Sequence, residues 1–166
     1  MAEKEPIIEE KLDHSGIFEF KAVYSFAHKW LKEEGFGVIE EKYSEKVAGN
    51  SRDISVKWTI EKKLTDYFKI EGEVEIEVKG LIEVEVEIDS EKKRTNKGKI
   101  SIGAKAMLIS DPESKWDENA FLKFFREIYN EYVIPHRVDK MKSYTENKIK
   151  SFKEELKALF EMMGRR

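Results

Sequence analysis

The stretch Phe68–Ile88, FKIEGEVEIEVKGLIEVEVEI, places apolar side chains at every second position and glutamates at most positions between them. Strict alternation predicts a β-strand with one buried face. One continuous strand over this length would be very long, and the KG pair is a turn signal, so we expect a hairpin with a loop at residues 79–81. Such a loop sets Val78 opposite Ile82 and keeps both apolar rows on one face. A two-residue loop would instead pair apolar with acidic positions.

The composition indicates one domain with its own core. The chain has 166 residues and is 40% hydrophobic, so we expect a single domain over residues 1–166, with residues 1–5 as a flexible tail. Charged residues make up 39%, but the net charge is only -3, which argues against a general nucleic-acid or membrane-surface binder. The absence of cysteine excludes disulfides and thiolate chemistry.

Two further features bear on the setting of the protein. Lysine and glutamate are abundant and glutamine is absent, which is typical of heat-adapted proteins. The first residues are followed by no long apolar run, so we expect neither a signal peptide nor a membrane anchor. The default expectation is a cytoplasmic protein.

The chain before the central stretch predicts strand, helix and strand. Residues 6–12 have few apolar anchors and predict a weak edge strand. Residues 17–34 carry apolar side chains at intervals of three and four, which predicts an amphipathic helix. Ser15 or Asp13 can supply its N-cap oxygen, and Gly35 suits the left-handed position that ends a helix.

The rest of the chain predicts strands and then helices. Extended patterns, with alternation clearest in the second and last, cover residues 36–47, 54–60 and 100–108, and the polar residues 89–98 between strands predict a loop. Capping-box spacing at residues 114–117 precedes a helical pattern that continues to Tyr132, and Pro135 ends or kinks that helix. A further pattern through Thr145, Ile149, Phe152, Leu156, Leu159 and Met163 predicts a long C-terminal helix.

This order of elements implies an α+β domain. We expect an antiparallel meander sheet of about six strands, with an N-terminal helix and two C-terminal helices packed on one face. With its meander at residues 54–108 and its helix at residues 149–163, the chain resembles the helix-grip architecture of the START-like superfamily, in which a curved sheet wraps a long C-terminal helix. The resemblance implies an apolar ligand cavity between the sheet and that helix.

Six glutamates form the outward row of the predicted hairpin: Glu73, Glu75, Glu77, Glu83, Glu85 and Glu87. The predicted register sets them opposite one another, which destabilises by a few tenths to about 1 kcal/mol per pair. Flanking strands would bring lysines beside them to offset this: Lys57, Lys63, Lys99 and Lys105. We interpret the row as a solvated charged face, and the functional alternative is a docking face for a basic partner. The carboxylates do not converge as a metal shell requires, so we expect no metal site.

Small side chains on the inward row raise the question of a cavity. Ala104 and Ala106 stand where other rows carry isoleucine and valine. Either a helix approaches closely there, or a cavity remains that could take an apolar ligand. Trp58, Phe68 and Met141 could line such a cavity, although aromatic and methionine side chains at this spacing usually belong to a core. Met107, considered with them, falls on the outward register.

No sequence motif points to catalysis. The basic run at residues 91–99 has no interleaved aromatic residue for base stacking, so we interpret it as a solvated loop and expect no nucleic-acid partner. His14, His28 and His136 lie far apart, without metal-ligand spacing. We therefore predict no catalytic residues and no cofactor, although an enzyme built from spatially convergent residues stays open.

Three functions remain. The first is a non-catalytic carrier of an apolar small molecule between the sheet and the C-terminal helix, as the START-like resemblance implies. The second is a protein-interaction module or self-assembling subunit that uses the glutamate face or the terminal helices. The third, an enzyme, requires a cleft where titratable groups converge.

Overall fold

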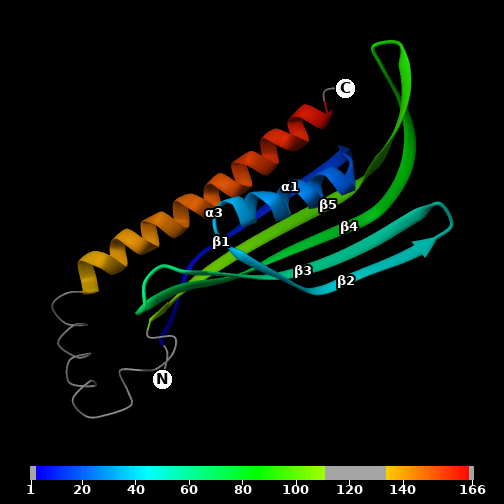
Figure 1. Cartoon of the computed structure of the whole chain (residues 1–166). Helices are drawn as coiled ribbons and strands as arrows, with labels where there is room; N and C mark the ends of the chain where they lie inside the picture. Colours follow the sequence, from blue (N-terminus) through cyan, green and yellow to red (C-terminus); the bar gives the residue numbers. More distant parts are fainter. Residues whose placement is uncertain (1–2, 111–133, 165–166) are drawn as a thin grey trace.

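The computed structural model describes residues 3–110 and 134–164 (Figure 1). Its elements, in chain order, are β1 (Glu3–Ile17), α1 (Phe20–Glu33), β2 (Gly37–Ala48), β3 (Ser51–Lys63), β4 (Phe68–Ile88), β5 (Glu91–Ser110) and α3 (Ile134–Gly164). The strands form one antiparallel sheet in the order β1-β5-β4-β3-β2. The predicted α+β class and antiparallel sheet are confirmed.

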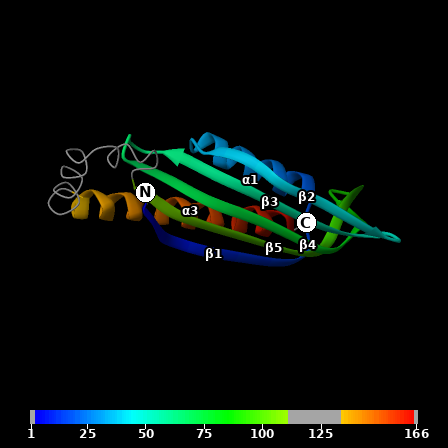
Figure 2. The ribbon, with the colours of Figure 1, turned by 90° about the horizontal axis from the view of Figure 1, so that it is seen from below.

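The two described helices, α1 and α3, lie on one side of the open sheet, as Figure 1 shows. Seen from below in Figure 2, α1 lies toward β2 and β3, while α3 runs along the side of β1. The meander β2 to β5 consists of consecutive antiparallel neighbours, and β1 joins the far side of β5. The strands β1 and β2 are therefore the two edges of the sheet.

The central stretch is one strand, not a hairpin. Strand β4 runs for 21 residues and pairs with the 20 residues of β5 along its length. The chain reverses at Asp89 and Ser90, whose positive φ angles of 51° and 67° are those of a tight two-residue hairpin turn. The predicted loop at residues 79–81 is wrong, and so is the loop predicted at residues 89–98. Because two predicted strands are one, the sheet has five strands instead of about six.

A β-bulge lies where we expected the turn. Lys79 pairs with Lys99 and Ile82 with Lys97, so Gly80 and Leu81 together stand opposite Gly98. Gly80 has a φ of 61°, and its N–H donates to Asp53 Oδ1 at 2.8 Å. A side chain at position 98 would crowd the bulge, because a Cβ there would lie 3.1 Å from Lys79 O and 3.2 Å from Gly80 O.

The bulge inverts which face each residue occupies. Val78 and Leu81 are both fully buried although they are three positions apart. By the alternation of the strand, Glu83 therefore lies on the same face as Leu81, and Ile82 lies on the same face as the outward residue Lys79. The segment of β4 and β5 beyond the bulge, residues 82–97, extends past the helices in Figure 1. We call this segment the arm.

Helix α1 is confirmed, with a later start than predicted. It begins at Phe20, and Ser15 and Asp13 belong to β1, so neither caps it; Glu19 holds the N-cap position without a side-chain hydrogen bond. The arm partly replaces the cap, since the Phe20 N–H donates to Asn96 Oδ1 at 3.4 Å. Gly35 ends the helix as predicted, with a φ of 89°.

Helix α3 confirms the predicted C-terminal helix. Pro135 lies in its first turn, where backbone N–H groups have no intrahelical acceptor, so the N–H that proline lacks is not needed there. The helix predicted up to Tyr132 lies outside the described residues. The predicted weak strand at residues 6–12 is the middle of the 15-residue β1, which also takes in residues 3–5.

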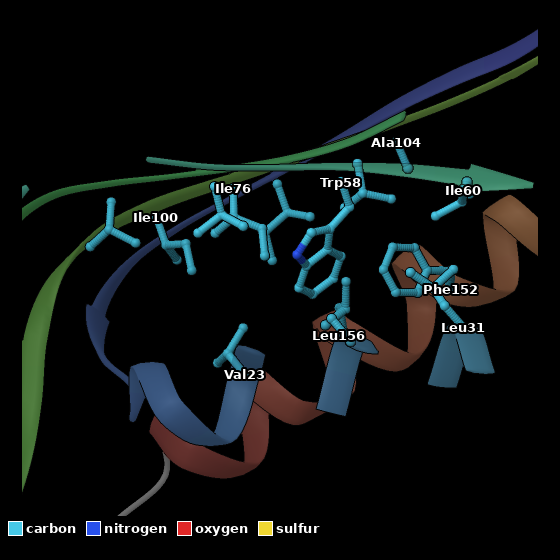
Figure 3. Close-up of a cluster of buried hydrophobic side chains, with 14 of the residues drawn as sticks. Val23, Leu31, Trp58, Ile60, Ile76, Ile100, Ala104, Phe152 and Leu156 are labelled. Atoms are coloured by element: carbon cyan, nitrogen blue, oxygen red, sulfur yellow. The ribbon is translucent and has the colours of Figure 1, made fainter. Parts of the chain in front are cut away.

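The core lies between the sheet and the two helices. Figure 3 shows Trp58 pointing from the sheet toward the helices, with Leu156 of α3 and Val23 of α1 on the helix side. All three side chains are almost completely excluded from water. A smaller cluster of Tyr67, Phe68 and Leu108 lies apart from this main core.

Charged side chains fix the helices to the sheet. Lys62 of β3 donates to the Glu34 carbonyl at 2.7 Å, at the end of α1, and to the Tyr144 hydroxyl of α3 at 2.8 Å. Lys148 of α3 pairs with the Glu34 carboxylate at 2.5 Å. Two further α3 lysines, Lys142 and Lys153, pair with Glu5 and Glu10 of β1. Part of the lysine-rich helix face is therefore used for docking rather than left exposed.

We predict that Gly72→Ala destabilises the fold strongly and Gly103→Ala does not. A Cβ at Gly72 would lie 2.4 Å from Lys105 O and 3.1 Å from Ile60 Cγ1, whereas nothing lies within 4 Å of one at Gly103. The expected loss for Gly72→Ala is roughly 3 kcal/mol, and that for Gly103→Ala is below about 0.5 kcal/mol. Urea unfolding measures both. Equal stabilities of the two variants would contradict the close approach of β4 and β5.

Candidate functional site

The six predicted glutamates do not form one face. Strand β4 places Glu73, Glu75 and Glu77 on the outer side of the sheet, away from the helices, while the bulge moves Glu83, Glu85 and Glu87 to the opposite face of the strand. The predicted glutamate pairs are absent from the register. Opposite Glu83, Glu85 and Glu87 stand Asn96, Arg94 and Lys92.

On the outer side, lysines neutralise the first glutamates. Glu73 pairs with Lys105 at 3.1 Å and with Lys57 at 3.7 Å. Both lysines are among the flanking residues that we predicted beside the glutamates. Hydrogen bonding to Lys105 is the main cause that lowers the pKa of Glu73, and the same bond raises the pKa of Lys105. The Ser55 hydroxyl donates to Glu77 at 2.6 Å. This part of the face has the charge-laced character that we predicted.

The predicted cavity residues divide between two clusters. Trp58, Ala104 and Ala106 belong to the main core, whereas Phe68 belongs to the smaller cluster, against which Met141 packs. The space beside Ala104 amounts to about 10 Å³. Phe152 and Leu156 of α3 line it, so the helix approaches the sheet closely at this point.

A polar cluster joins α1 to β2 and β3. Glu40 of β2 accepts a hydrogen bond from the Tyr24 hydroxyl at 2.6 Å and one from Trp58 Nε1 at 3.4 Å. Burial, followed by the hydrogen bond and negative charge of Glu40, raises the pKa of Tyr24 to about 12. Burial also raises the pKa of the neighbouring Tyr43. The cluster satisfies the buried indole N–H and so has a structural role.

A hollow of about 220 Å³ lies between the arm and the end of α3. Its apolar lining comes from three elements: Ile17 of β1, Val86 of β4 and Met163 of α3. Lys93, Arg94 and Thr95 of β5 add polar lining, together with Glu19 in the turn before α1. We call this hollow the arm cleft.

The arm cleft has a cationic side. Lys93 has no carboxylate partner within 4 Å in the part of the chain that the structure describes, and Arg94 reaches only Glu83, at 4.0 Å. The Arg94 side chain is 78% exposed. Two cations beside an apolar floor can bind a molecule that has an apolar body and an anionic end.

Sequence reasoning did not predict the arm cleft. The interpretation of residues 91–99 as a loop placed Lys93 and Arg94 away from any apolar surface, and Met163 was assigned only to a helix face. The signal in the sequence is the glycine at position 98, since Gly80 and Gly98 together allow a bulge. Val86 and Met163 lie far apart in the sequence, so no local pattern brings them together.

The described residues show no catalytic arrangement in this cleft. Clearly shifted pKa values occur at Tyr24, Tyr43, Lys69, Glu73, Lys105 and Lys148, and none of these residues lines it. The His14 ring stacks on the Phe160 ring with 4.6 Å between centroids, and the His28 ring packs edge-on against Trp58 with 5.5 Å between centroids. Both histidines therefore have packing roles. Within residues 3–110 and 134–164, no three His, Cys, Asp or Glu side chains are placed to hold a metal ion.

In the described residues, the fold and the cleft define an α+β protein with an open antiparallel sheet, two helices on one face and a small cleft at one end of the helices. Comparison of the chain with protein-family models and with curated proteins finds no match. Neither of the described helices is long and apolar enough to cross a membrane.

The space beside Ala104 leads to a prediction about packing. We expect Ala104→Leu to destabilise the fold by about 1–3 kcal/mol, because Phe152 and Leu156 leave no room for the added carbons. The exposed Ala158 of α3 gives the matched control, and Ala158→Leu should change stability by less than about 0.5 kcal/mol. Chemical unfolding checks both. An unchanged or raised stability of Ala104→Leu would indicate an open cavity instead.

The raised pKa of Tyr24 predicts a pH dependence. The folded state holds the proton up to about pH 12, whereas an unfolded tyrosine loses it near its ordinary pKa of 10. The stabilisation due to Tyr24 is therefore complete below pH 10 and is lost as the pH rises toward 12. The stability difference between the wild type and Tyr24→Phe, measured by urea unfolding, should stay constant up to pH 10 and then decrease. A difference that does not change with pH would contradict this assignment.

Proposed function

We propose that this protein is a non-catalytic binding module that holds a small amphipathic molecule with an anionic group between its sheet and its C-terminal helix, in the arm cleft. One observation carries the proposal: a hollow of about 220 Å³ has an apolar floor and a cationic side, and it lies between the arm and α3. The resemblance to helix-grip proteins stays a prediction, and it points to the same two layers.

The floor favours an apolar ligand body. Ile17, Val86 and Met163 come from three different elements, and each is half-buried, so some of their surface is still open to water. Covering apolar surface with an apolar ligand contributes roughly 25 cal/mol per Å². A ligand in this place would complete a partly formed core.

The charges favour an anionic end. The described lining has two cations, Lys93 and Arg94, and one carboxylate, Glu19. An arginine can bind a carboxylate or phosphate with two parallel hydrogen bonds, and a charge-assisted bond of this kind is about twice as strong as a neutral one. A carboxylate or phosphate group at this side would give Lys93 the partner that it lacks among the described residues.

Size and position favour this cleft over other hollows. Two larger hollows, of about 540 and 450 Å³, lie on the outer side of the sheet; they expose more apolar lining than the arm cleft but are more open to solvent. The arm cleft is more enclosed because α3 closes one side of it. Its volume is below the roughly 300–1,000 Å³ of drug-sized sites, which limits the ligand to a small molecule.

The interior position implied by Ala104 and Ala106 is less suitable. A ligand beside Ala104 would have to displace Phe152 or Leu156 from a space of about 10 Å³. Each displaced side chain would cost about 2–5 kcal/mol of core packing. The arm cleft requires no such displacement.

Octanoate and octylamine test the proposal, because they share an apolar chain and differ in charge. We expect octanoate to bind the full chain at one site and octylamine to bind at least tenfold more weakly. Lys93→Glu should weaken octanoate binding about tenfold or more, since a hydrogen bond to a charged group contributes about 1.5–3 kcal/mol. Isothermal titration calorimetry measures the affinities, and chemical-shift changes locate the site.

Lys92→Glu is the matched control. Lys92 precedes Lys93 on the same exposed strand, stands opposite Glu87 and does not line the cleft. This variant should bind octanoate as the wild type does. The proposal fails if octanoate and octylamine bind equally, if neither binds, or if Lys92→Glu weakens binding as much as Lys93→Glu.

A further inference from the structure

Strand β2 is an edge strand with an open side. It pairs only with β3 in the described chain, so the backbone N–H and C=O groups on its other side have no strand partner there. Five large hydrophobic side chains in the described chain are exposed, and three of them lie on β2: Ile39 at 55%, Tyr43 at 47% and Val47 at 68%. A long edge with apolar side chains is a surface for pairing with another strand.

The other edge of the sheet is protected. Helix α3 packs along β1, and its Lys142 and Lys153 pair with Glu5 and Glu10 there. Pro6 also removes one N–H from that edge. Strand β2 contains no proline, and Tyr43, whose ring packs edge-on against Tyr24, is the last residue of β2 with a described contact to α1. The two edges therefore differ in the way expected if only β2 meets a partner.

We propose that β2 pairs antiparallel with β2 of a second copy of this chain, about a twofold axis that passes beside Glu45. The pairing would join two five-stranded sheets edge to edge. This inference uses none of the residues that line the arm cleft and does not depend on the ligand proposed there.

The bulge in β2 limits the paired segment. Glu40 pairs with Trp58 and Lys42 with Lys57, so Glu41 is an extra residue that interrupts the regular edge. The regular part is residues 42–48. A twofold axis normal to the sheet sets residues of the same face opposite each other. At least five residue pairs form within this segment only if the axis passes beside Ser44, Glu45 or Lys46.

Self-complementarity selects Glu45 as the centre. A centre at Ser44 would set Lys42 opposite Lys46, and a centre at Lys46 would set the two copies of that lysine opposite each other. With Glu45 at the centre, Tyr43 of each copy stands opposite Val47 of the other. Each dimer would then contain two Tyr43–Val47 contacts, and these would cover both exposed apolar side chains of the segment.

Arg52 offsets the charge at the axis. The two Glu45 carboxylates would face each other, which alone would be unfavourable. Each already pairs with Arg52 of its own β3, with Nη1 to Oε1 at 3.0 Å. The centre would thus contain two carboxylates and two guanidinium groups, so that each negative charge can lie beside a positive one.

The helices leave room for the second copy. In Figure 1 the end of the β2–β3 hairpin extends past the N-terminal end of α1. A centre at Glu45 places most of the partner strand alongside this free end of the hairpin, and within the paired segment Tyr43 is the residue that contacts α1. The α1 helices of the two copies are then offset along the strands.

Sedimentation over a dilution series of the full chain tests the dimer. We expect a concentration-dependent species of twice the 19.5 kDa chain mass. Val47→Lys should raise the dissociation constant at least tenfold, because it places an ammonium group against the Tyr43 ring region of each partner and removes two apolar contacts. Ile39→Lys, on the same strand but before the bulge, is a matched control of similar exposure and should not change the constant.

Single cysteines test the register, since the chain contains none of its own. Glu45→Cys places two thiols directly opposite each other, so mild oxidation should link the copies rapidly. Tyr43→Cys, which faces Val47 instead, should link much more slowly. A monomer at every concentration overturns the proposal, as does a dimer that Ile39→Lys abolishes. A dimer in which Tyr43→Cys links faster than Glu45→Cys overturns the register.

Discussion

The inner row of β4 is the constraint on which the rest of the fold depends. Ile70, Val74, Ile76 and Val78 are completely buried, and β4 pairs with β3 on one side and β5 on the other. Burial of each such side chain stabilises the fold by about 1.5–3 kcal/mol. A shift of register by one residue would turn the whole row to solvent, so both neighbouring strands are held in one register. The inserted residue at Gly80 is tolerated because it comes after this row ends.

Small residues on the sheet match large ones that approach it. Gly72 stands beside Ile60 on β3 and Ala106 on β5, and Ala104 faces Phe152 of α3. Protein interiors are close-packed, so a missing side chain in one layer is filled by a larger one from another. The alanines that could indicate a cavity in the sequence are therefore the places where the helix comes nearest to the sheet. Helix position and side-chain size at these sites are two aspects of one packing solution.

The sequence allowed the α+β class, α1, α3 and the outer glutamate–lysine face to be predicted, because each depends on local periodicity or on adjacent strands. It did not allow the arm to be predicted. The pattern from Ile82 to Val86 keeps the same period after Gly80, so alternation alone cannot show that one extra residue has inverted the faces. Only the partner strand reveals it, through Gly98, and pairing between distant residues is not encoded in a local pattern.

The same reasoning explains why residues 91–97 looked like a loop. A two-stranded ribbon beyond the helices has no large buried face, and its residues need no hydrophobic alternation. Its polar side chains instead form cross-strand neighbours of opposite charge, with Arg94 opposite Glu85 and Lys92 opposite Glu87. Polar composition therefore indicated solvent exposure correctly and secondary structure incorrectly.

Both proposed binding surfaces lie where strands extend beyond the helices. In Figure 1 the arm and the end of the β2–β3 hairpin extend past the N-terminal end of α1, and the end of α3 lies beside the arm. Residues in the helix-covered part of the sheet are restricted to side chains that fill the core. Val47 and Lys93 have no such requirement, since they are exposed and lie outside the core. Apolar or unpaired charged side chains at these positions contribute little to folding, so contacts with a second molecule are the interactions left for them to make.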